Sequence, residues 1–542
     1  MLLTSRRLRA VLLAAASASL VAAAPPAPGP LGVGDRLFPT LGNPGYDVRS
    51  YDIGLTYTGD NKKPLDAVTT LDATATSRLD RFNLDFTHGT VRSVRVNGAP
   101  AAFAPAGEDL VVTPAEPVEA GDPLRITVRG TSETGGPAGA GGWVRTTDGL
   151  VMANQADAAH RVFPCDDHPD DKAFFTFHVS APKKLTVVAN GEEVARKADG
   201  ADTTWTYRTR HPMATELAQV SIGTSAVIHR TGPHGLPVRD VVPAADKAKL
   251  EPWLAKTPGM IEWMEQRVGR YPFEDYGVLI AGADTGFELE TQTLSLFERN
   301  LFIGGGYPAW YVDSVLVHEL SHQWFGDSVS PHRWSDLWLN EGHATWYEGT
   351  YAEEHGGPSF ESRMREAYAQ SDGWRTAGGP PARPKAPVPG QSISIFRPIE
   401  YDGSALVLYA LRQEVGAATF SRIERDWVRE NRDSSASTAD FTALASHDAS
   451  RDLTAFFQGW LYGTKTPPMP GHPDWKPAPA AQSGTKPQQQ GAGAAPGGQG
   501  ARPAQHVTKR PAQPVTKRLP SGITAGPAAG RAYSAVPGGG HA

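Results

Sequence analysis

The chain contains 542 residues but only one cysteine, Cys165. A single cysteine cannot form a disulfide within the chain, which excludes a disulfide framework. Cys165 does not stand at the end of the N-terminal leader, so it offers no site for a lipid anchor there. A nucleophilic cysteine needs a nearby histidine base, and spacing in the sequence alone cannot demonstrate one. We therefore expect Cys165 to be structural.

An apolar run long enough for a membrane anchor is also missing. The short apolar run that follows Arg6 and Arg7 ends in three alanines before Pro25, and it resembles the core and cleavage site of an export signal. The sequence predicts a signal peptide over residues 1–24, a linker over 25–44, and a secreted protein without a transmembrane segment. The two arginines leave the general and the twin-arginine export routes open.

A surplus of positive charge is absent from the chain, whose formal net charge is −6. The basic residues gather in the last stretch, so the body is more acidic than the whole, which excludes nucleic acid as a partner. Residues 471–542 are rich in Pro, Ala, Gly and Gln, and residues 502–509 are nearly repeated at 510–517. Such a segment cannot form a core, and we predict a disordered basic tail. It is expected to act as a spacer or to associate weakly with anionic cell-wall polymers.

The pattern of apolar residues changes near the middle of the chain. Alternating residues and the turn pairs Asn97-Gly98 and Asn190-Gly191 predict hairpins and an N-terminal β-sandwich, saddle-like domain over residues 45–233. Helical periodicity then begins near Ala244 and predicts a mainly helical domain with a small sheet over residues 234–470. The predicted fold class is α+β.

The stretch His318-Glu319-Leu320-Ser321-His322 carries the clearest chemical signal. Histidines at i and i+4 lie on one helix face, where both rings can bind one metal ion. Glu341 is expected on a second helix, capped by Ser335, from which its carboxylate can complete a three-ligand site. Three protein ligands leave a position for water, and Glu319 is placed to act as the general base on that water.

The alternative for this motif is a chance match on a solvated helix face. The surrounding residues argue against it, because buried charge needs a partner. They form a dense apolar background: Trp310, Val312, Val315, Leu316, Leu320, Trp324 and Phe325. The sequence therefore predicts one Zn²⁺ per chain, held by His318, His322 and Glu341.

Around these ligands the chain resembles the gluzincin metallopeptidases, in particular the aminopeptidase N family that includes the leukotriene hydrolases. The similarity is carried by residues 317–324 and by Trp338-Leu339-Asn340-Glu341-Gly342, and it extends from about residue 155 to residue 470. It implies a thermolysin-like catalytic domain. The long helical domain that larger members add is absent from this sequence, which therefore resembles a short, two-domain bacterial form.

The same resemblance implies further site residues. Glu290, in the segment 286–292, matches the glutamate that holds the free ammonium of the substrate, although Thr291 replaces the usual Asn. Gln155 and Asp157 match a second ammonium-binding segment, with Asp157 where the family has Glu or Gln. Tyr401 matches the tyrosine that stabilises the oxyanion during catalysis.

Glu288 is a departure from the family pattern. If the segment is a strand, Glu288 faces the same side as Glu290, and it adds negative charge that favours short or basic substrates. The alternative is that Glu288 turns to solvent. His343 is expected to be a packing or surface residue rather than a zinc ligand, because it lies nearly opposite Glu341 on the helix.

Together these features predict a secreted, monomeric, zinc-dependent aminopeptidase that acts on peptides with a free N-terminus. Buried carboxylates at a closed cleft end bind an ammonium group and disfavour blocked or internal peptides. One alternative is a metalloendopeptidase with the same zinc chemistry, and another is a catalytically silent peptide-binding homologue. Epoxide hydrolysis is a third and more remote alternative.

Overall fold

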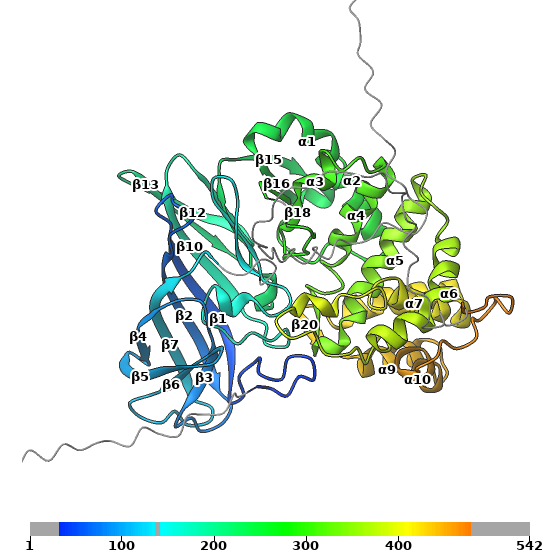
Figure 1. Cartoon of the computed structure of the whole chain (residues 1–542), viewed down its shortest axis with the longest axis horizontal. Coiled ribbons are helices and arrows are strands. Elements are labelled where there is room, and N and C mark those ends of the chain that lie inside the picture. The colour runs from blue at the N-terminus through cyan, green and yellow to red at the C-terminus, as the bar shows by residue number, and fades with distance from the viewer. Residues whose placement is uncertain (1–31, 136–140, 284, 479–542) are drawn as a thin grey trace, which may run out of the picture.

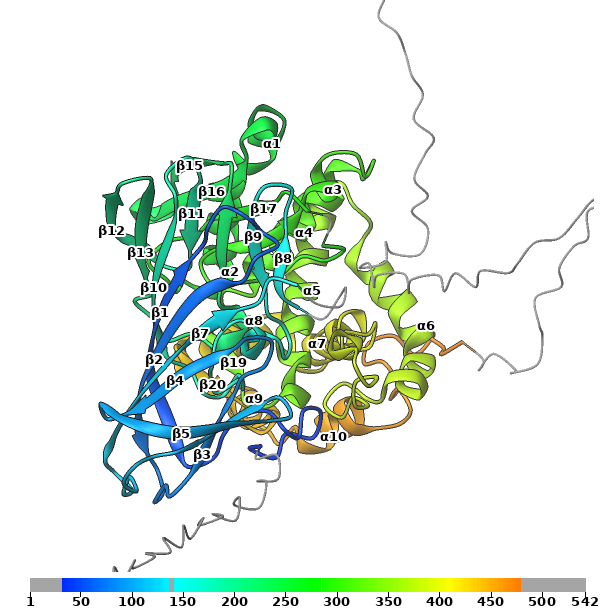
Figure 2. The ribbon, with the colours of Figure 1, turned by 60° about the vertical axis from the view of Figure 1, so that its left-hand side comes forward.

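The computed structural model describes residues 32–135, 141–283 and 285–478 of the chain. Sheets make up one half of the molecule and helices most of the other half (Figure 1). The second view keeps the two halves distinct, with β12 at one side and α6 at the other (Figure 2). The α+β fold class is therefore confirmed. The predicted signal peptide and most of the predicted tail lie outside the described residues.

The largest sheet has ten strands, and the pairing of β1 with β10 is parallel. Many of its strands alternate buried and exposed residues, as expected for a sheet with one face in a core. In spatial order the strands are β12 (Glu192–Asp199), β13 (Asp202–Arg208), β10 (Phe174–Pro182), β1 (Tyr46–Thr56), β2 (Leu65–Ala75), β7 (Pro123–Ser132), β4 (Val91–Val96), β5 (Ala99–Ala106), β6 (Asp109–Thr113) and β3 (Phe82–Asp85).

A second sheet covers the inner face of the first. Its strands, in spatial order, are β11 (Thr186–Ala189), β14 (Val220–Gly223), β9 (Leu150–Ala153) and β8 (Gly142–Arg145). Apolar side chains of both sheets form one core, in which Phe177 of the large sheet and Val187 of the small one are both buried. Cys165 lies fully buried in the same core, where burial raises the pKa of its thiol well above the usual range. This packing matches the predicted sandwich.

A third, mixed sheet joins the two halves. Its strands are β15 (Ser225–Thr231), β16 (Pro237–Pro243), β17 (Val278–Ala281) and β18 (Ser295–Glu298). Because successive side chains point to opposite faces, Val241 and Leu279 pack into the sandwich core while Val242 and Ile280 pack into the helical core. The hairpin β15–β16 crosses residue 233, so this sheet begins before the boundary that the sequence suggested.

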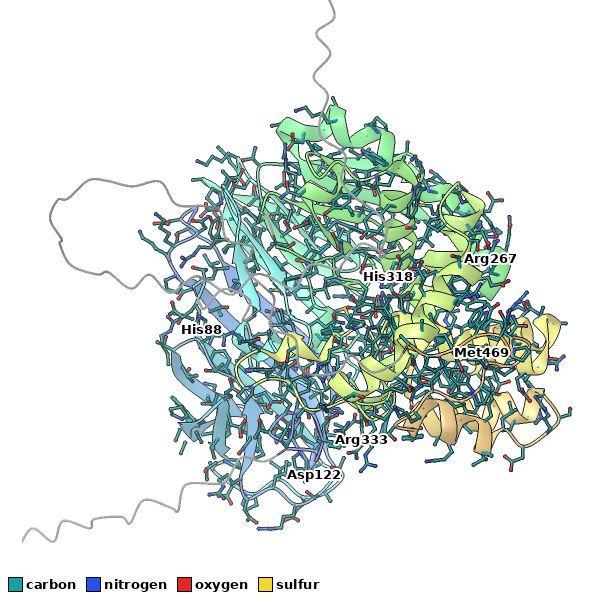
Figure 3. All side chains as sticks on the ribbon, turned by 45° about the vertical axis from the view of Figure 1, so that its right-hand side comes forward. His88, Asp122, Arg267, His318, Arg333 and Met469 are labelled. Atoms are coloured by element: carbon teal, nitrogen blue, oxygen red, sulfur yellow. The ribbon has the colours of Figure 1, made fainter. Side chains whose placement is uncertain are left out.

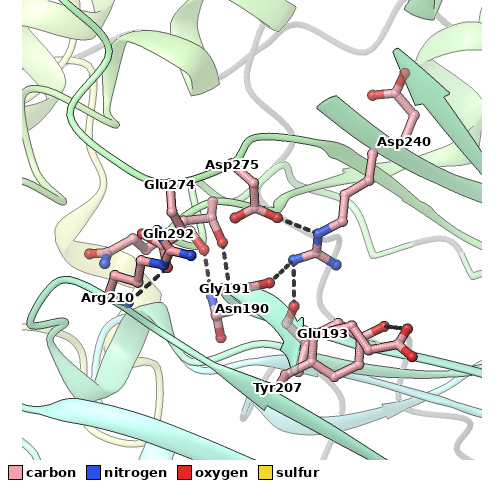
Figure 4. Close-up of polar contacts among 12 residues, drawn as sticks. Asn190, Gly191, Glu193, Tyr207, Arg210, Asp240, Glu274, Asp275 and Gln292 are labelled. Carbon is pink, nitrogen blue, oxygen red and sulfur yellow. Dashed lines mark hydrogen bonds and ion pairs between the residues drawn. The ribbon is translucent and has the colours of Figure 1, made fainter. Parts of the chain in front are cut away.

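A polar network ties the third sheet to the sandwich (Figure 4). The Arg239 guanidinium donates to Asp275 Oδ2 at 2.5 Å and to the carbonyl of Gly191 at 2.7 Å. The neighbouring Asn190 amide donates to the carbonyl of Gln292 at 2.6 Å. Gln292 is the last residue of the predicted substrate-binding segment 286–292, so this network helps to fix that segment against the N-terminal domain.

The helical half is built on a core of large apolar and aromatic side chains. Its helices are α1 (Lys247–Leu254), α2 (Thr257–Val268), α3 (Arg299–Phe302), α4 (Ala309–Ser321), α5 (Trp338–Glu354), α6 (Phe360–Gly378), α7 (Asp402–Val415), α8 (Ala417–Glu430), α9 (Thr438–Asp448) and α10 (Thr454–Tyr462). A short ladder of β19 (Val329–Pro331) and β20 (Ser434–Ala436) lies beside them. Within the described ranges, no helix is both long and apolar enough to cross a membrane.

Both ends of the described chain are more ordered than the sequence predicts. In the predicted linker, Leu37 and Phe38 are buried against residues of the helical half. At the other end, Trp475 is buried and stacks on Tyr409, with ring centroids 5.7 Å apart, although it falls within the predicted disordered tail. At both ends these large apolar side chains stand among Pro and Gly residues and follow no regular period. The sequence pattern therefore does not predict that they pack against the rest of the molecule.

Candidate metal centre and active site

Helix α4 carries His318 and Glu319, and His322 is the cap residue at its end. Figure 3 shows His318 in the interior of the molecule. All three side chains are at most 2% exposed. The helix ends at Ser321, but the cap residue His322 keeps helical torsions (φ −58°, ψ −27°). The i, i+4 relation is therefore preserved, and the two imidazole rings lie 4.9 Å apart.

Helix α5 brings Glu341 to these rings. Its Oε2 lies 3.3 Å from His318 Nε2 and 3.7 Å from His322 Nε2. Donors about 2.0–2.1 Å from a tetrahedral ion stand roughly 3.3 Å from one another, so the spacing fits one zinc ion. Ser335 does not cap this helix as predicted, because a 3-10 turn over Trp334–Asp336 precedes it.

The outer nitrogens of both rings have partners that fix the tautomer. His322 Nδ1 lies 3.1 Å from the carbonyl oxygen of Phe325, which can only accept, so Nδ1 donates. His318 Nδ1 lies 2.9 Å from Glu348 Oε2. Both Nε2 lone pairs are then directed toward Glu341, which is the arrangement that a metal ion needs.

Glu348 and Arg363 form a second layer that was not predicted. Burial raises the pKa of Glu348, but the Arg363 guanidinium, 3.0 Å away, and the His318 ring outweigh it and lower the pKa to about 2. The carboxylate is therefore charged and holds the His318 ring. The sequence contains a signal for this contact, because Glu348 follows Glu341 by two helical turns and so lies on the same face of α5.

Tyr401 stands next to the metal ligands, at the N-terminal cap of α7. Its ring centroid is 6.1 Å from that of His318. The following residue, Asp402, accepts from Arg363 at 2.6 Å, which links the start of α7 to the second layer of α5. Helices α5 and α7 approach closely at Gly342, where an added Cβ would meet the Ser404 side chain at 2.9 Å.

The predicted ammonium site assembles on the other side of His322. Glu290 is buried, and its Oε1 lies 2.7 Å from Gln155 Nε2 and 3.9 Å from His322 Nδ1. Gln323, which follows the motif, donates to the backbone carbonyl of Glu290 at 3.0 Å. Glu290, Glu319 and His322 also have ligand atoms within 4.8 Å of one another, so the predicted base lies close both to the predicted anchor and to a predicted metal ligand.

The segment that carries Glu290 is not the regular strand that we predicted. Only an isolated bridge joins Leu289 to Leu296. Strand alternation therefore does not place Glu288 on the same side as Glu290. Glu288 is half-buried, and so is Asp157, two residues beyond Gln155.

Two buried acids near Glu290 were not predicted. Burial and the charge of Glu290 raise the pKa of Glu216 well above its usual range, and Gln155 donates a hydrogen bond to it. Burial and the charges of Glu290 and Glu216 do the same to the pKa of Asp327. Glu216 lies in a 3-10 helix and Asp327 in a turn, outside the predicted substrate-binding segments. A cation bound near these acids and Glu290 would relieve the repulsion that raises their pKa values.

His343 has the packing role that was expected. Its ring stacks on Phe325 with centroids 4.3 Å apart, and its nitrogens lie 2.5 Å from the carbonyl of Leu339 and 3.1 Å from Glu424 Oε1. It faces away from the three predicted ligands.

Comparison with known proteins agrees with this geometry. The chain matches the Peptidase family M1 domain over residues 254–460 and the Peptidase M1 N-terminal domain over residues 145–217. The crystal structure of an M1 zinc metallopeptidase from Deinococcus radiodurans aligns with a TM-score of 0.69 and 26% identity, covering 83% of this chain and 99% of that one. A mutant of the D. radiodurans enzyme bound to a Tyr-Ser-Ala substrate aligns with the same TM-score and identity, covering 81% of this chain and 99% of that one.

Curated relatives are similar over about half of this chain. Glutamyl aminopeptidase from Mus musculus is 24% identical over 55% of this chain, and leucine aminopeptidase 2 from Pyricularia oryzae is 26% identical over 49%. The matched regions span only 34% and 44% of these relatives' own lengths. Two domains of one family, matched in order on a shared fold, establish that the chain belongs to the peptidase M1 family of gluzincin, aminopeptidase N-like zinc metallopeptidases.

Proposed function

We propose that this protein is a zinc-dependent aminopeptidase that removes the first residue of peptides with a free N-terminus. The observation that carries the proposal is the distance between two parts of the site. Carboxylate oxygens of Glu290 and of the proposed base Glu319 lie within 4.8 Å of each other. An ammonium held by Glu290 and Gln155 leaves room for about one residue, roughly 3.8 Å of chain, before the position where Glu319 acts. The bond presented for hydrolysis is therefore the first one.

In this proposal His318, His322 and Glu341 hold the zinc ion. When bound, zinc polarises the scissile carbonyl and lowers the pKa of a water molecule toward about 7. Glu319, which is buried beside the ligands, takes the proton of the attacking water and delivers it to the leaving amine. The Tyr401 hydroxyl donates to the negative charge that develops on the carbonyl oxygen.

Glu290 and Gln155 bind the substrate ammonium, and Asp157 belongs to the same anchoring segment. The buried acids Glu216 and Asp327 support this role, because a substrate ammonium would relieve their repulsion with Glu290, whereas a blocked N-terminus would not. Glu288 is proposed to favour short or basic substrates, which is supported by its negative charge two residues from Glu290 and not by strand geometry.

We also propose that the protein is exported through a signal peptide at residues 1–24 and acts outside the cell as a monomer. The basic leader and the alanines before Pro25 support export. The basic tail is assigned as a spacer with weak affinity for anionic cell-wall polymers. The proposed units are a sandwich domain from residue 45 to 233 and a peptidase domain from 234 to 470.

The test is a panel of fluorogenic aminoacyl amides, each made with a free and an N-acetylated amine. The wild type should hydrolyse the free forms and leave the acetylated forms intact, and Glu290→Ala should lose most of its activity on the free forms. Equal turnover of free and blocked amides would contradict the proposal and favour a metalloendopeptidase. A protein that binds one zinc per chain but hydrolyses neither form would be the silent homologue.

A further inference from the structure

Residues 33–43, which we call the clasp, form a closed turn on the surface of both domains. The Val33 amide donates to the carbonyl of Leu41 at 3.2 Å, and the Leu41 amide donates to the carbonyl of Phe38 at 3.2 Å. Gly42 has φ +77°, and a Cβ there would meet Val33 Cγ2 at 2.9 Å. The turn is therefore compact, and it directs Leu37, Phe38 and Leu41 to one side. The dark blue segment before β1 reaches from the sheets toward the helices (Figure 1).

The apolar side of the clasp forms a small core of its own, separate from the two large ones. Leu37, Phe38 and Leu41 are at most 5% exposed. The Phe38 ring meets the edge of Trp334 with centroids 5.7 Å apart. The partners of these three residues in the small core are Ala156, Trp334, Leu337 and Ile395.

Polar contacts fix the clasp to the helical half. Asp35 is 1% exposed, and its carboxylate accepts from the Trp334 amide at 2.9 Å and from the Leu37 amide at 2.7 Å. Arg333 donates to the carbonyl of Gly34 at 2.9 Å. A buried carboxylate that accepts two backbone amides is a strong and specific attachment.

The other end of the clasp is fixed to the sandwich. The Asp85 carboxylate accepts from the Gly42 amide at 3.2 Å and from the Asn43 side chain at 2.8 Å. The Asn43 amide donates to Asp166 Oδ1 at 3.1 Å. The clasp therefore bridges the two domains.

The partners of the clasp are next to the residues that we assign to the active site. Ala156 follows Gln155 of the ammonium site. Trp334 and Leu337 immediately precede α5, which carries Glu341. Ile395 lies in the segment that leads to Tyr401. Glu400 in that segment is fully buried, and the positive charges of Arg397 and of Arg36 in the clasp act on it.

We propose that the clasp is a positioning element of the active site, which holds the segments of Gln155, Glu341 and Tyr401 in their relative places without touching the substrate. This inference rests on the proposed function, because it assigns the three segments to one reaction. Catalysis depends on such placement, and a shift of about 1 Å can lower a rate by about 10²-fold. Loss of clasp packing is therefore expected to lower activity in molecules that remain folded.

The test compares Phe38→Ala with the conservative Phe38→Leu and with Thr40→Ala, a change at an exposed position of the same turn. Each variant is assayed as the full, zinc-loaded chain well below its unfolding midpoint. Three quantities are measured: kcat and KM for a free aminoacyl amide, the rate of zinc loss to a chelator, and the unfolding temperature. If Phe38→Ala does not fold, Asp35→Asn replaces it in the same measurements, because this change keeps the size of the side chain.

Phe38→Ala is expected to lower kcat/KM by at least about tenfold and to speed zinc loss, with Phe38→Leu close to the wild type and Thr40→Ala unchanged. A lower unfolding temperature with unchanged kcat, KM and zinc loss would overturn the inference and leave the clasp as a stability element. Failure of the wild type to hydrolyse the free amide would instead contradict the proposed function. The two failures are therefore distinguishable, since zinc loss is measured without turnover.

Discussion

The two ends of the site are built in different ways. The metal end is made of His318, His322 and Glu341. The helical spacing within α4 and the packing of α4 against α5 fix these three residues. The ammonium end, made of Glu290, Gln155 and Glu216, comes from irregular segments far apart in the sequence. The residues that we assign to water activation thus lie on regular helices. The residues that we assign to recognition of the substrate N-terminus lie on irregular segments, whose positions depend on how the domains pack.

The largest expected effect concerns the metal end. Glu319→Gln removes the general base but keeps the size of the side chain, so kcat/KM should fall by about 10²–10⁴-fold. Zinc content should stay at one per chain, because Glu319 is not one of the three proposed ligands. Steady-state kinetics with metal analysis provide the measurement. Activity within tenfold of the wild type would remove Glu319 from the proposed mechanism.

A somewhat smaller effect is expected at Tyr401, where the helical and loop parts of the site meet. Tyr401→Phe removes one hydroxyl donor to the oxyanion, and such a loss costs about 10²–10³-fold in kcat. KM should change little, because the hydroxyl acts on charge that develops in the transition state. Steady-state kinetics on a free aminoacyl amide separate the two constants. A change confined to KM would place Tyr401 in substrate binding instead.

At the ammonium end the effect should appear in selectivity. Gln155→Ala removes one partner of the substrate ammonium and of Glu290, so kcat/KM for free aminoacyl amides should fall about 10–100-fold. Acetylated amides should stay intact with this variant, as they do with the wild type. Glu288→Ala is the matched comparison: it should leave the preference for free amines intact and change the ranking of peptides by their second residue.

A substitution of Glu348, behind the metal ligands, tests whether helix packing alone is enough to position His318. Glu348→Gln keeps the shape of the side chain but removes the charge that holds His318, so zinc affinity should fall about 10–100-fold. Competition with a calibrated chelator measures this affinity. An unchanged affinity would show that helix packing positions His318 without Glu348.

The same contrast explains what the sequence could predict. Helical periodicity encodes neighbours on one helix directly, so the sequence pattern alone is enough to group His318, Glu319 and His322. Glu341 lies on a second helix, and it reaches these residues through the packing of α5 against α4. The turn that carries Gln155 meets Glu290 only through the packing of whole domains. The family resemblance nominates these two residues, but their contact does not follow from spacing.

The incorrect predictions also have physical causes. Segment 286–292 has the pattern of a strand, but it forms only one isolated bridge. Ser335 is a residue type that often caps helices, but a 3-10 turn over residues 334–336 precedes the helix. The clasp has the sequence of a linker because its three apolar residues follow no helical or strand period, and their partners lie more than a hundred residues away.

The most direct test of the central claim is the order in which products appear. A peptide of five different residues with a free N-terminus is incubated with the zinc-loaded protein, and the products are followed over time by mass spectrometry. The account predicts release of single residues in sequence order, beginning with the first, and no release from the same peptide after N-acetylation. Early release of dipeptides or internal fragments would contradict it.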